Sequence, residues 1–343
     1  MVRVLCYGAG AVGTLVGGCL ARAGNPVALV GRPAHVDAVN GNGLLMLRPG
    51  APPQRVPVRG YSSLAQALAA GFDPQLVLLT VKGFDTPAAI TDLRALPPEA
   101  VVLTLQNGIG NEELLAQALG AGRTISGCIT LSVGLPEPGA VQLHSARGGI
   151  GLAPLAADVA PVAALLREAG FTVQTYPDYR ALKWSKLLLN MLGNAVCAVL
   201  DLPPEEVFRD RALCALERAA FLEALAVMRA QGIRPVDLPG FPVRLLSLLF
   251  RLLPPALLSR LLARRLGSGR GDKMPSLWID LQKGRPRSEA AQLNGAVAAR
   301  GKELGVRTPV NSRIMSALSE ILADPARREH YRHYAPALIS PHR

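Results

Sequence analysis

Three polar residues stand four positions apart in an otherwise apolar stretch, WSKLLLNMLGNAVCAVL: Lys186, Asn190 and Asn194. If the stretch forms one helix, residues at i, i+4 and i+8 lie on the same face. The Leu, Met, Val and Ala residues around them predict a buried helix, in which an amine and two amides cost free energy unless they are paired. Either other protein groups pair with them or a polar ligand does. A ligand is favoured by the phosphate-binding loop at the other end of the chain.

That loop fits the pattern G-x-G-x-x-G and consists of Gly8, Ala9, Gly10, Ala11, Val12 and Gly13. It follows an apolar strand at residues 2–7 and opens a small-residue helix at 11–23, which is the context of a dinucleotide-binding loop. Gly8 permits the tight turn, Gly10 lets the backbone approach a pyrophosphate, and Gly13 lets the helix pack closely on the strand. The N–H groups at the helix start attract phosphates. The alternative is a glycine turn without a ligand.

The second strand predicts which dinucleotide is bound. Residues 27–30 (VALV) run into Gly31 and Arg32, where an NAD-binding protein would carry an acid for the ribose 2′-hydroxyl. An arginine at this place can clamp a 2′-phosphate, which an acid would repel. We therefore expect the cofactor NADPH/NADP+ rather than NADH. His35 follows closely, and we interpret it as a solvent-exposed residue.

Two further loops are expected at the same ligand site. Lys82 directly follows the strand LVLLTV, and Asn107-Gly108 follows VVLTLQ. In a doubly wound sheet, ligands bind outside the carboxyl ends of the strands, so both loops belong to the cofactor site. Asn107 can hydrogen-bond the ribose or nicotinamide region, although ordinary turn chemistry would also explain each residue.

The order of elements predicts two domains. Apolar strands alternate with helical patterns at 2–7, 27–30, 76–81, 101–105 and 125–130. This alternation predicts an α/β Rossmann-type doubly wound domain over residues 1–177. Residues 140–152 and 171–175 are interpreted as a hairpin and an edge strand. Residues 178–325 predict an all-α substrate and catalytic domain, and residues 326–343 a tail with a short helix and a loose end.

Residues 234–272 form an unusual insertion in the helical half. Pro254-Pro255 splits it into two basic, Leu-rich amphipathic pieces. Such pieces can lie on a membrane surface, but we favour a helical hairpin packed on the domain or on a second subunit. The apolar faces at 213–228 and 245–262 could support a homodimer, and core packing explains them equally well.

The composition, net charge and cysteine pattern of the chain argue against several classes of protein. The 343 residues carry a net charge of +12 and a pI of about 10.0, but the basic residues are spread out and aromatic residues are only 4%, so nucleic acid is not expected as a partner. The cysteines, five in number, show no CxxC and lie in apolar runs, which favours a cytoplasmic location and no metal site. The N-terminus has no signal-peptide pattern, and no apolar run predicts a membrane span.

The chain resembles the ketopantoate reductase (2-dehydropantoate 2-reductase) family. The similarity lies in ordered motifs: GAGAVG at 8–13, GR at 31–32, VKGFDT at 81–86, LQNGIG at 105–110, PGAVQLH at 138–144, KWSKLLLNMLGN at 183–194, PSLWIDLQKGRPRSEAAQLNG at 275–295 and LGVRTPVNSRI at 304–314. The resemblance implies that Lys186 is the general acid and that Asn190 and Asn194 bind the substrate. It also implies that Glu289 holds the substrate hydroxyl and that Ser276 lies near the substrate carboxylate.

The resemblance implies an NADPH-dependent reductase of a small-molecule 2-oxo acid, converting 2-dehydropantoate to pantoate for pantothenate biosynthesis. Two alternatives stay open. One is the reduction of a bulkier 2-oxo acid or an imine, shaped by residues 234–272. The other is a non-catalytic NADPH-binding regulator, which would not need both Lys186 and Glu289.

Overall fold

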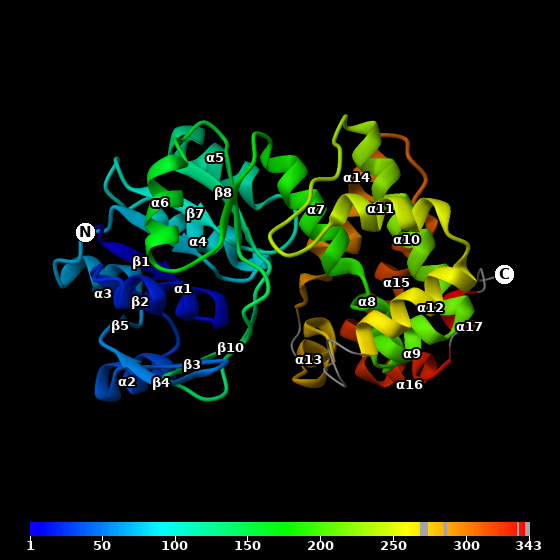
Figure 1. Cartoon of the computed structure of the whole chain (residues 1–343), viewed down its shortest axis with the longest axis horizontal. Helices are drawn as coiled ribbons and strands as arrows, with labels where there is room; N and C mark the ends of the chain where they lie inside the picture. Colours follow the sequence, from blue (N-terminus) through cyan, green and yellow to red (C-terminus); the bar gives the residue numbers. More distant parts are fainter. Residues whose placement is uncertain (268–273, 285–286, 335, 340–343) are drawn as a thin grey trace. The chain divides into compact units, whose positions relative to one another are not determined.

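The computed structural model describes residues 1–267, 274–284, 287–334 and 336–339 (Figure 1). It divides into two compact units, Met1–Lys183 with Asp237–Phe241, and Trp184–Val236 with Pro242–Arg343. The first unit is a parallel-sheet α/β structure and the second is helical, which confirms the predicted fold class. The division falls inside helix α7 (Tyr179–Met191), whereas the sequence placed the boundary near residue 178.

Eight strands form the main sheet of the first unit in the order β5-β2-β1-β6-β7-β8-β11-β12. They are β1 Val4–Tyr7, β2 Val27–Val30, β5 Arg59–Tyr61, β6 Leu76–Leu79, β7 Val101–Thr104, β8 Thr124–Ile129, β11 Ile150–Pro154 and β12 Val173–Thr175. The strands from β5 to β8 are parallel, and β11 is antiparallel to β8. The chain adds β2 and β5 on one side of β1 and then β6 on the other. The strand order therefore reverses between β1 and β6, where such sheets bind ligands.

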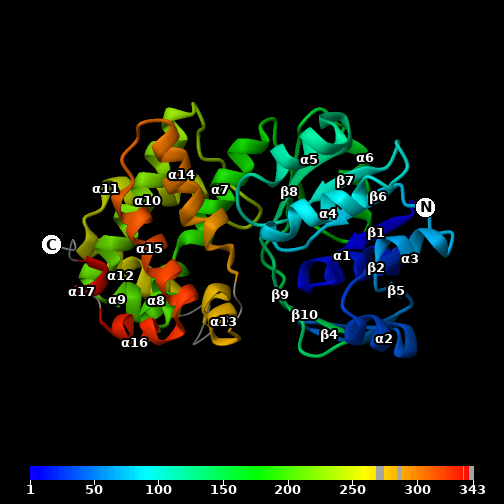
Figure 2. The ribbon, with the colours of Figure 1, turned by 180° about the vertical axis from the view of Figure 1, so that it is seen from behind.

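Helices cover both faces of this sheet. Alternate strand residues point to opposite faces, so in β1 Val4 and Cys6 join one apolar cluster and Leu5 joins the other. Residues of α1 and α6 belong to the first cluster, and residues of α3, α4 and α5 to the second. Figure 1 and Figure 2 label these helices. Their bounds are α1 Ala11–Arg22, α3 Leu64–Ala69, α4 Thr86–Leu93, α5 Asn111–Leu119 and α6 Ala160–Glu168.

A second sheet was not predicted. It has the order β4-β3-β10-β9, with β3 Leu44–Arg48, β4 Ala51–Val56, β9 Ser132–Gly134 and β10 Ala140–Ser145. The predicted hairpin over residues 140–152 is wrong, because β10 pairs with β3 and β9 while β11 pairs with β8 and β12. The chain between them is tied to the main sheet, since Thr130 N donates to Gly149 O and Gly149 N donates to Thr130 Oγ1, both at 2.9 Å. Helix α2, Pro33–Asn42, packs on β5.

The second unit is built around the long helix α10. The helices are α8 Ala195–Leu200, α9 Pro204–Arg209, α10 Arg211–Ala230, α11 Val243–Leu252, α12 Pro255–Gly267, α13 Ser276–Gln282, α14 Asn294–Glu303, α15 Pro309–Ala323, α16 Arg328–Tyr331 and α17 Pro336–Ile339. Asp210 begins α10 by accepting hydrogen bonds from Ala212 N and Leu213 N. Helices α9, α11, α12, α14 and α15 pack against α10. The apolar face at 213–228 is therefore core.

The insertion contains two helices that pack on the domain, as the sequence favoured, although their described residues pack on α10 rather than on each other as a hairpin would. Helix α11 ends at Leu252 and α12 begins at Pro255, and both pack on α10 of the same unit. Residues 268–272 of the insertion lie outside the described residues. Its early part, Asp237–Phe241, belongs instead to the first unit, where Asp237 O accepts a hydrogen bond from Tyr176 Oη at 2.7 Å. Among the described helices, none has the length and apolar character needed to span a membrane.

The tail is packed further than the sequence predicted. Tyr331 and Leu338 are buried, and Arg313 Nη1 donates to Leu338 O at 2.9 Å. The expectation of a loose end is therefore wrong as far as Leu338, because two apolar side chains cover part of the helical core. Residues 340–343 lie outside the described residues.

Candidate active site

The glycine-rich loop is shaped by close contacts between β1, α1 and the chain after β6. Gly8 has φ +107°, and a Cβ there would lie 2.7 Å from Val81 N. A Cβ on Gly13 would lie 2.5 Å from Gly8 O, and Thr80 Oγ1 donates to this same carbonyl at 2.6 Å. Both positions therefore require glycine for packing and backbone conformation.

Gly10 differs from these two glycines. The nearest atom to a Cβ at this position would be 4.0 Å away, so no protein group of the loop crowds it. Gly10 is the N-cap of α1, whose first-turn N–H groups have no acceptor within the helix. An open backbone surface beside unpaired N–H groups fits a pyrophosphate. The residues present therefore fit the dinucleotide that the motif predicts.

Arg32 is held next to this loop by its neighbour Gly31. A Cβ on Gly31 would lie 2.6 Å from Ala9 Cβ, and Ala9 N donates to Val30 O at 2.8 Å. The end of β2 therefore packs on the glycine loop. Arg32 is exposed at the N-cap of α2, directly after this contact.

His35 is buried, so the prediction that it is solvent-exposed is wrong. Its Nδ1 accepts a hydrogen bond from Gly139 N at 3.1 Å, and its Nε2 lies 3.3 Å from Thr14 Oγ1. Desolvation lowers the pKa of the imidazole. His35 thus connects α2, α1 and the turn before β10, and that turn was not predicted because β10 pairs with strands the sequence did not reveal.

Lys82 and Asn107 lie after adjacent strands of the same sheet. Lys82 is the half-buried N-cap of a 3-10 turn, Gly83–Asp85, beyond β6. Asn107 is half-buried in the loop beyond β7, beside Gly108 with φ +87°. Since β1, β6 and β7 are neighbours and parallel, the structure brings the three predicted cofactor loops to one edge of the sheet.

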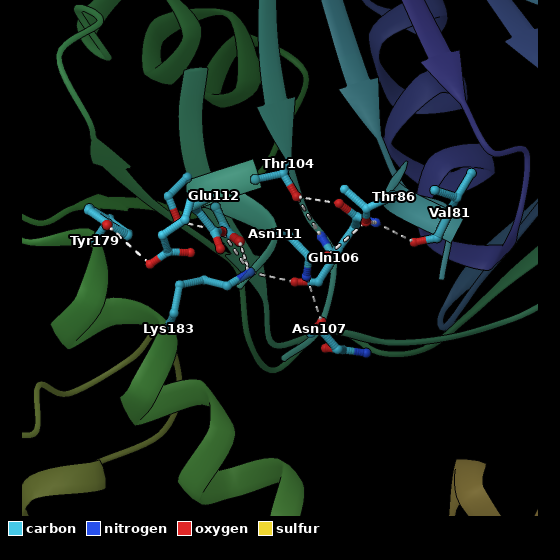
Figure 3. A network of polar contacts seen from close by, with 12 residues as sticks. Val81, Thr86, Thr104, Gln106, Asn107, Asn111, Glu112, Tyr179 and Lys183 are labelled. Carbon is cyan, nitrogen blue, oxygen red and sulfur yellow. Dashed lines mark hydrogen bonds and ion pairs between the residues drawn. The ribbon is translucent and has the colours of Figure 1, made fainter. Parts of the chain in front are cut away.

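A polar network supports the loop that carries Asn107 (Figure 3). Gln106 Nε2 donates to Val81 O at 3.0 Å and to Thr86 Oγ1 at 2.8 Å. Thr86 Oγ1 in turn donates to Asn111 Oδ1 at 2.8 Å, and Asn111 Nδ2 donates to Asn107 O at 3.3 Å. The loops after β6 and β7 are therefore joined by the buried amide of Gln106.

Lys183 is the cation of this network. Its Nζ lies 3.0 Å from Glu112 Oε1 and donates to Gln106 O at 2.5 Å, and both charged side chains are almost fully buried (Figure 3). Ser126 Oγ also donates to Glu112 Oε1 at 2.9 Å. Sequence reasoning missed Lys183, although a second lysine three residues before Lys186, directly before the apolar stretch, was a visible signal.

Lys186 and Asn190 interact as the predicted helical spacing requires. Lys186 Nζ donates to Asn190 Oδ1 at 2.9 Å, and both side chains are half-buried. The expected single helix through Asn194 is wrong, because α7 ends at Met191 and Gly193 has φ +57°. Asn194 is instead the N-cap residue of α8. Its Nδ2 still donates to Asn190 O at 2.9 Å, so the three residues remain connected.

Ser276 and Glu289 lie in later elements of the second unit. Ser276 is exposed at the first position of α13, and the next residue, Leu277, donates through its N–H to Asn194 Oδ1 at 3.4 Å. The structure thus brings the start of α13 to Asn194. Glu289 is buried in a 3-10 turn, Glu289–Gln292, which packs against α14 and α15.

Comparison with known proteins identifies the family. The family description "Ketopantoate reductase PanE/ApbA" matches residues 4–157, and its C-terminal counterpart matches residues 178–322. This chain belongs to the ketopantoate reductase family. A 2-dehydropantoate 2-reductase of Halobacterium salinarum is 31% identical over 90% of this chain and 95% of the relative. A Pyrococcus horikoshii 2-dehydropantoate 2-reductase is 29% identical over 90% of this chain and 94% of the relative.

The solved structures agree with this membership. The crystal structure of a PanE/ApbA family ketopantoate reductase from Ralstonia eutropha has a TM-score of 0.79 and 31% identity, covering 94% of this chain and 99% of that one. The chain is an oxidoreductase of the 2-dehydropantoate 2-reductase type, and ketopantoate reductases use NADPH. Among the described residues, no group of three or more His, Cys, Asp or Glu side chains is arranged to hold a metal ion.

Proposed function

We propose that this protein uses NADPH to reduce 2-dehydropantoate to pantoate for pantothenate biosynthesis, in the cytoplasm. The observation that carries the proposal is the Lys186–Asn190 pair, in which an amide oxygen holds an ammonium group 2.9 Å away on a half-buried helical face. Reduction of a ketone needs a proton at oxygen as well as a hydride at carbon. A positioned ammonium is suited to donate that proton.

In the proposed mechanism, Lys186 hydrogen-bonds the keto oxygen of the substrate. When bound, NADPH supplies the hydride for the carbonyl carbon. As negative charge develops on the oxygen, the Lys186 ammonium stabilises it and transfers a proton, which leaves a neutral amine and the product hydroxyl. Asn190 orients the ammonium through its Oδ1 atom.

The other site residues are proposed to bind rather than to react. Asn190 and Asn194 offer amides to the substrate, and Ser276 hydrogen-bonds its carboxylate. Glu289 accepts a hydrogen bond from its hydroxyl. Because Asn194 already donates to Asn190 O and accepts from Leu277 N, it also holds the turn between α7 and α8 in place.

The cofactor is proposed to bind along the loops of the first unit. The N–H groups at Ala11 and Val12 bind the pyrophosphate, and Arg32 binds the 2′-phosphate. Lys82 and Asn107 contact the remainder of the cofactor from the loops after β6 and β7. The buried Gln106 network keeps these two loops fixed relative to each other.

The loss of NADPH absorbance with a panel of 2-oxo acids tests the proposal. We expect the largest kcat/KM with 2-dehydropantoate, and an at least ~10-fold lower value with bulkier 2-oxo acids and with cyclic imines. A larger kcat/KM for one of those compounds would identify that compound, rather than 2-dehydropantoate, as the substrate. Tight NADPH binding without turnover of any compound would instead identify a regulator.

The proposal includes a homodimer. Helix α11 exposes Leu245, Leu248 and Leu252 by 49%, 49% and 70%, and their spacing places them along one side of the helix. A second copy that covers these leucines would remove apolar surface from water. Light scattering should give twice the chain mass of 36.1 kDa, and a monomer mass would exclude the dimer.

A further inference from the structure

A cavity of about 310 Å³ opens in the first unit, away from the loops described above. Its lining comes from one side of α1, the β3–β4 turn, the residue before β9, β10 with the chain that follows it, and the turn between α6 and β12. Gly10 caps one end of the 12-residue helix α1 and Arg22 ends it, so the Arg22 side of the cavity lies about 18 Å along the helix from Gly10, whereas the Leu15 side lies in the first half of the helix. None of the lining residues belongs to the proposed cofactor site.

The interior of the cavity is apolar. Leu15, Leu131, Leu143, Ala169 and Phe171 line it, and Leu15 is 1% exposed. Such a surface favours the hydrocarbon part of a ligand. The cavity is large enough for a small molecule and too small for a dinucleotide.

Two arginines, Arg22 and Arg48, give the cavity its charge. Its lining, all of it within the described residues, contains no Asp or Glu. Both residues are half-buried, and within the described part of the chain neither has a hydrogen-bond or ion-pair partner. Arg22 Nη2 would lie 3.6 Å from a Cβ on Gly170, which places it over the turn at the cavity wall.

The two guanidinium groups act on one point, the thiol of Cys19. Both lower the pKa of this thiol, but desolvation is the larger effect and raises it overall. Cys19 therefore lines the cavity as a neutral group and leaves the positive charge of Arg22 and Arg48 uncompensated. Arg22 in the last turn of α1 is favourable for the helix dipole without any ligand, whereas Arg48 in the β3–β4 region has no such role.

We propose that this cavity binds a small amphipathic carboxylate. Its hydrocarbon body packs on Leu143 and Phe171, and its carboxylate pairs with Arg22 and Arg48. A guanidinium group offers parallel N–H donors that match a carboxylate, and partial burial strengthens the pair. The apolar lining disfavours inorganic phosphate and other small polyanions, which would lose hydration without enough donors.

Isothermal titration calorimetry of the full chain with octanoate, below its micelle concentration, tests this site. We expect saturable one-to-one binding that persists when the protein is saturated with NADP+, because no residue of the cavity lining belongs to the proposed cofactor site. Neither 1-octanol, which lacks the charge, nor inorganic phosphate, which lacks the chain, should bind with comparable affinity. Absence of octanoate binding, or its loss on addition of NADP+, would overturn the proposal.

Two variants localise the binding. The double variant Arg22→Ala/Arg48→Ala should weaken octanoate binding at least ~10-fold, and Leu143→Trp, which fills the cavity but keeps both charges, should do the same. Arg94→Ala removes an exposed cation outside the cavity and should leave the affinity unchanged. Urea unfolding monitors the fold of each variant. Equal affinity in wild type, in the double variant and in Leu143→Trp would place octanoate elsewhere.

Discussion

Lys183 and Glu112 form a buried ion pair, with 3.0 Å between Nζ and Oε1. Lys183 precedes Lys186 by three residues in helix α7. The two lysines of this helix thus have different environments. Lys183 is 3% exposed and also donates to Gln106 O, whereas Lys186 is half-buried and contacts Asn190. One lysine holds the loop that carries Asn107, and the other is the proposed acid.

Lys183→Met should destabilise the fold. It leaves the Glu112 carboxylate buried without its cation, which typically costs about 3–5 kcal/mol. Urea unfolding measures the loss. The double variant Lys183→Met/Glu112→Gln should recover part of it, because no unpaired buried charge remains. Equal stability of Lys183→Met and the wild type would show that the ion pair does not support the loop.

Lys186→Ala should have the opposite pattern. We expect kcat to fall by about 10²–10⁴-fold, as for the loss of a general acid, while NADPH binding and the free energy of unfolding change little. Steady-state kinetics and a fluorescence titration of NADPH measure the two effects. Unchanged kcat in this variant would end the general-acid assignment.

The predictable parts of this structure are those set by local sequence. The strand, glycine loop and helix from Val4 to Arg22 follow from an apolar run and fixed glycine spacing. The second sheet was not predictable, because its two central strands, β3 and β10, lie about a hundred residues apart in the sequence and their pairing joins the β3–β4 and β9–β10 pairs into one sheet. The break after Met191 was also missed, although Gly193 marks it, because the apolar run continues through it.

The candidate site shows the same distinction. The hydrogen bond from Lys186 to Asn190 follows from i, i+4 spacing alone. The roles of Gln106 and His35 depend on contacts between elements distant in sequence, such as His35 with Gly139. A buried polar side chain can be recognised from sequence only when its partner is near in the chain.

Gly10→Ala and Gly13→Ala should separate binding from folding. The methyl group added by Gly10→Ala would meet no protein atom closer than 4.0 Å, so we expect stability within about 0.5 kcal/mol of wild type and roughly 10-fold weaker NADPH binding. A Cβ at position 13 would lie 2.5 Å from Gly8 O, so Gly13→Ala should cost about 1–3 kcal/mol without any cofactor. Unfolding of the apo protein and NADPH titration measure both. Equal effects of the two substitutions would contradict the distinct roles.

Arg32→Asp should change the cofactor preference. Loss of a charge-assisted hydrogen bond costs about 1.5–3 kcal/mol, so kcat/KM for NADPH should fall by roughly 10- to 100-fold while the value for NADH stays similar. Arg59→Ala, which removes another exposed arginine in β5, is the matched control and should alter neither value. An unchanged NADPH-to-NADH ratio in Arg32→Asp would rule out the phosphate clamp.

Glu289→Ala should affect only substrates that carry the hydroxyl. We expect KM for 2-dehydropantoate to rise roughly 10- to 100-fold, since a hydrogen bond to a charged group is lost. A 2-oxo acid with the same carbon skeleton but no hydroxyl is the matched control, and its KM should change little. Parallel increases for both substrates would assign Glu289 to the fold of the turn rather than to the hydroxyl.

Glu217→Gln should make the protein less sensitive to alkaline pH. Burial raises the pKa of the Glu217 carboxyl from 4.5 to about 8, although a hydrogen bond from Gly193 N opposes the increase. Between these pH values the folded chain holds a proton that the unfolded chain has released. The group's contribution to stability is therefore complete below about pH 4.5 and is lost as the pH rises through about 8.

Urea unfolding of wild type and Glu217→Gln at pH 6 and pH 9 measures this effect. A tenfold difference in proton affinity corresponds to about 1.4 kcal/mol. From pH 6 to pH 9 the free energy of unfolding should therefore fall by at least ~1 kcal/mol more for wild type than for Glu217→Gln. Glu206→Gln changes an exposed carboxyl of α9. Its free energy of unfolding should change with pH by the same amount as that of wild type. If the free energy of unfolding of Glu217→Gln showed the same pH dependence as that of wild type, the carboxyl of Glu217 would have an ordinary pKa. The turn between α7 and α8 would then not depend on a buried neutral acid.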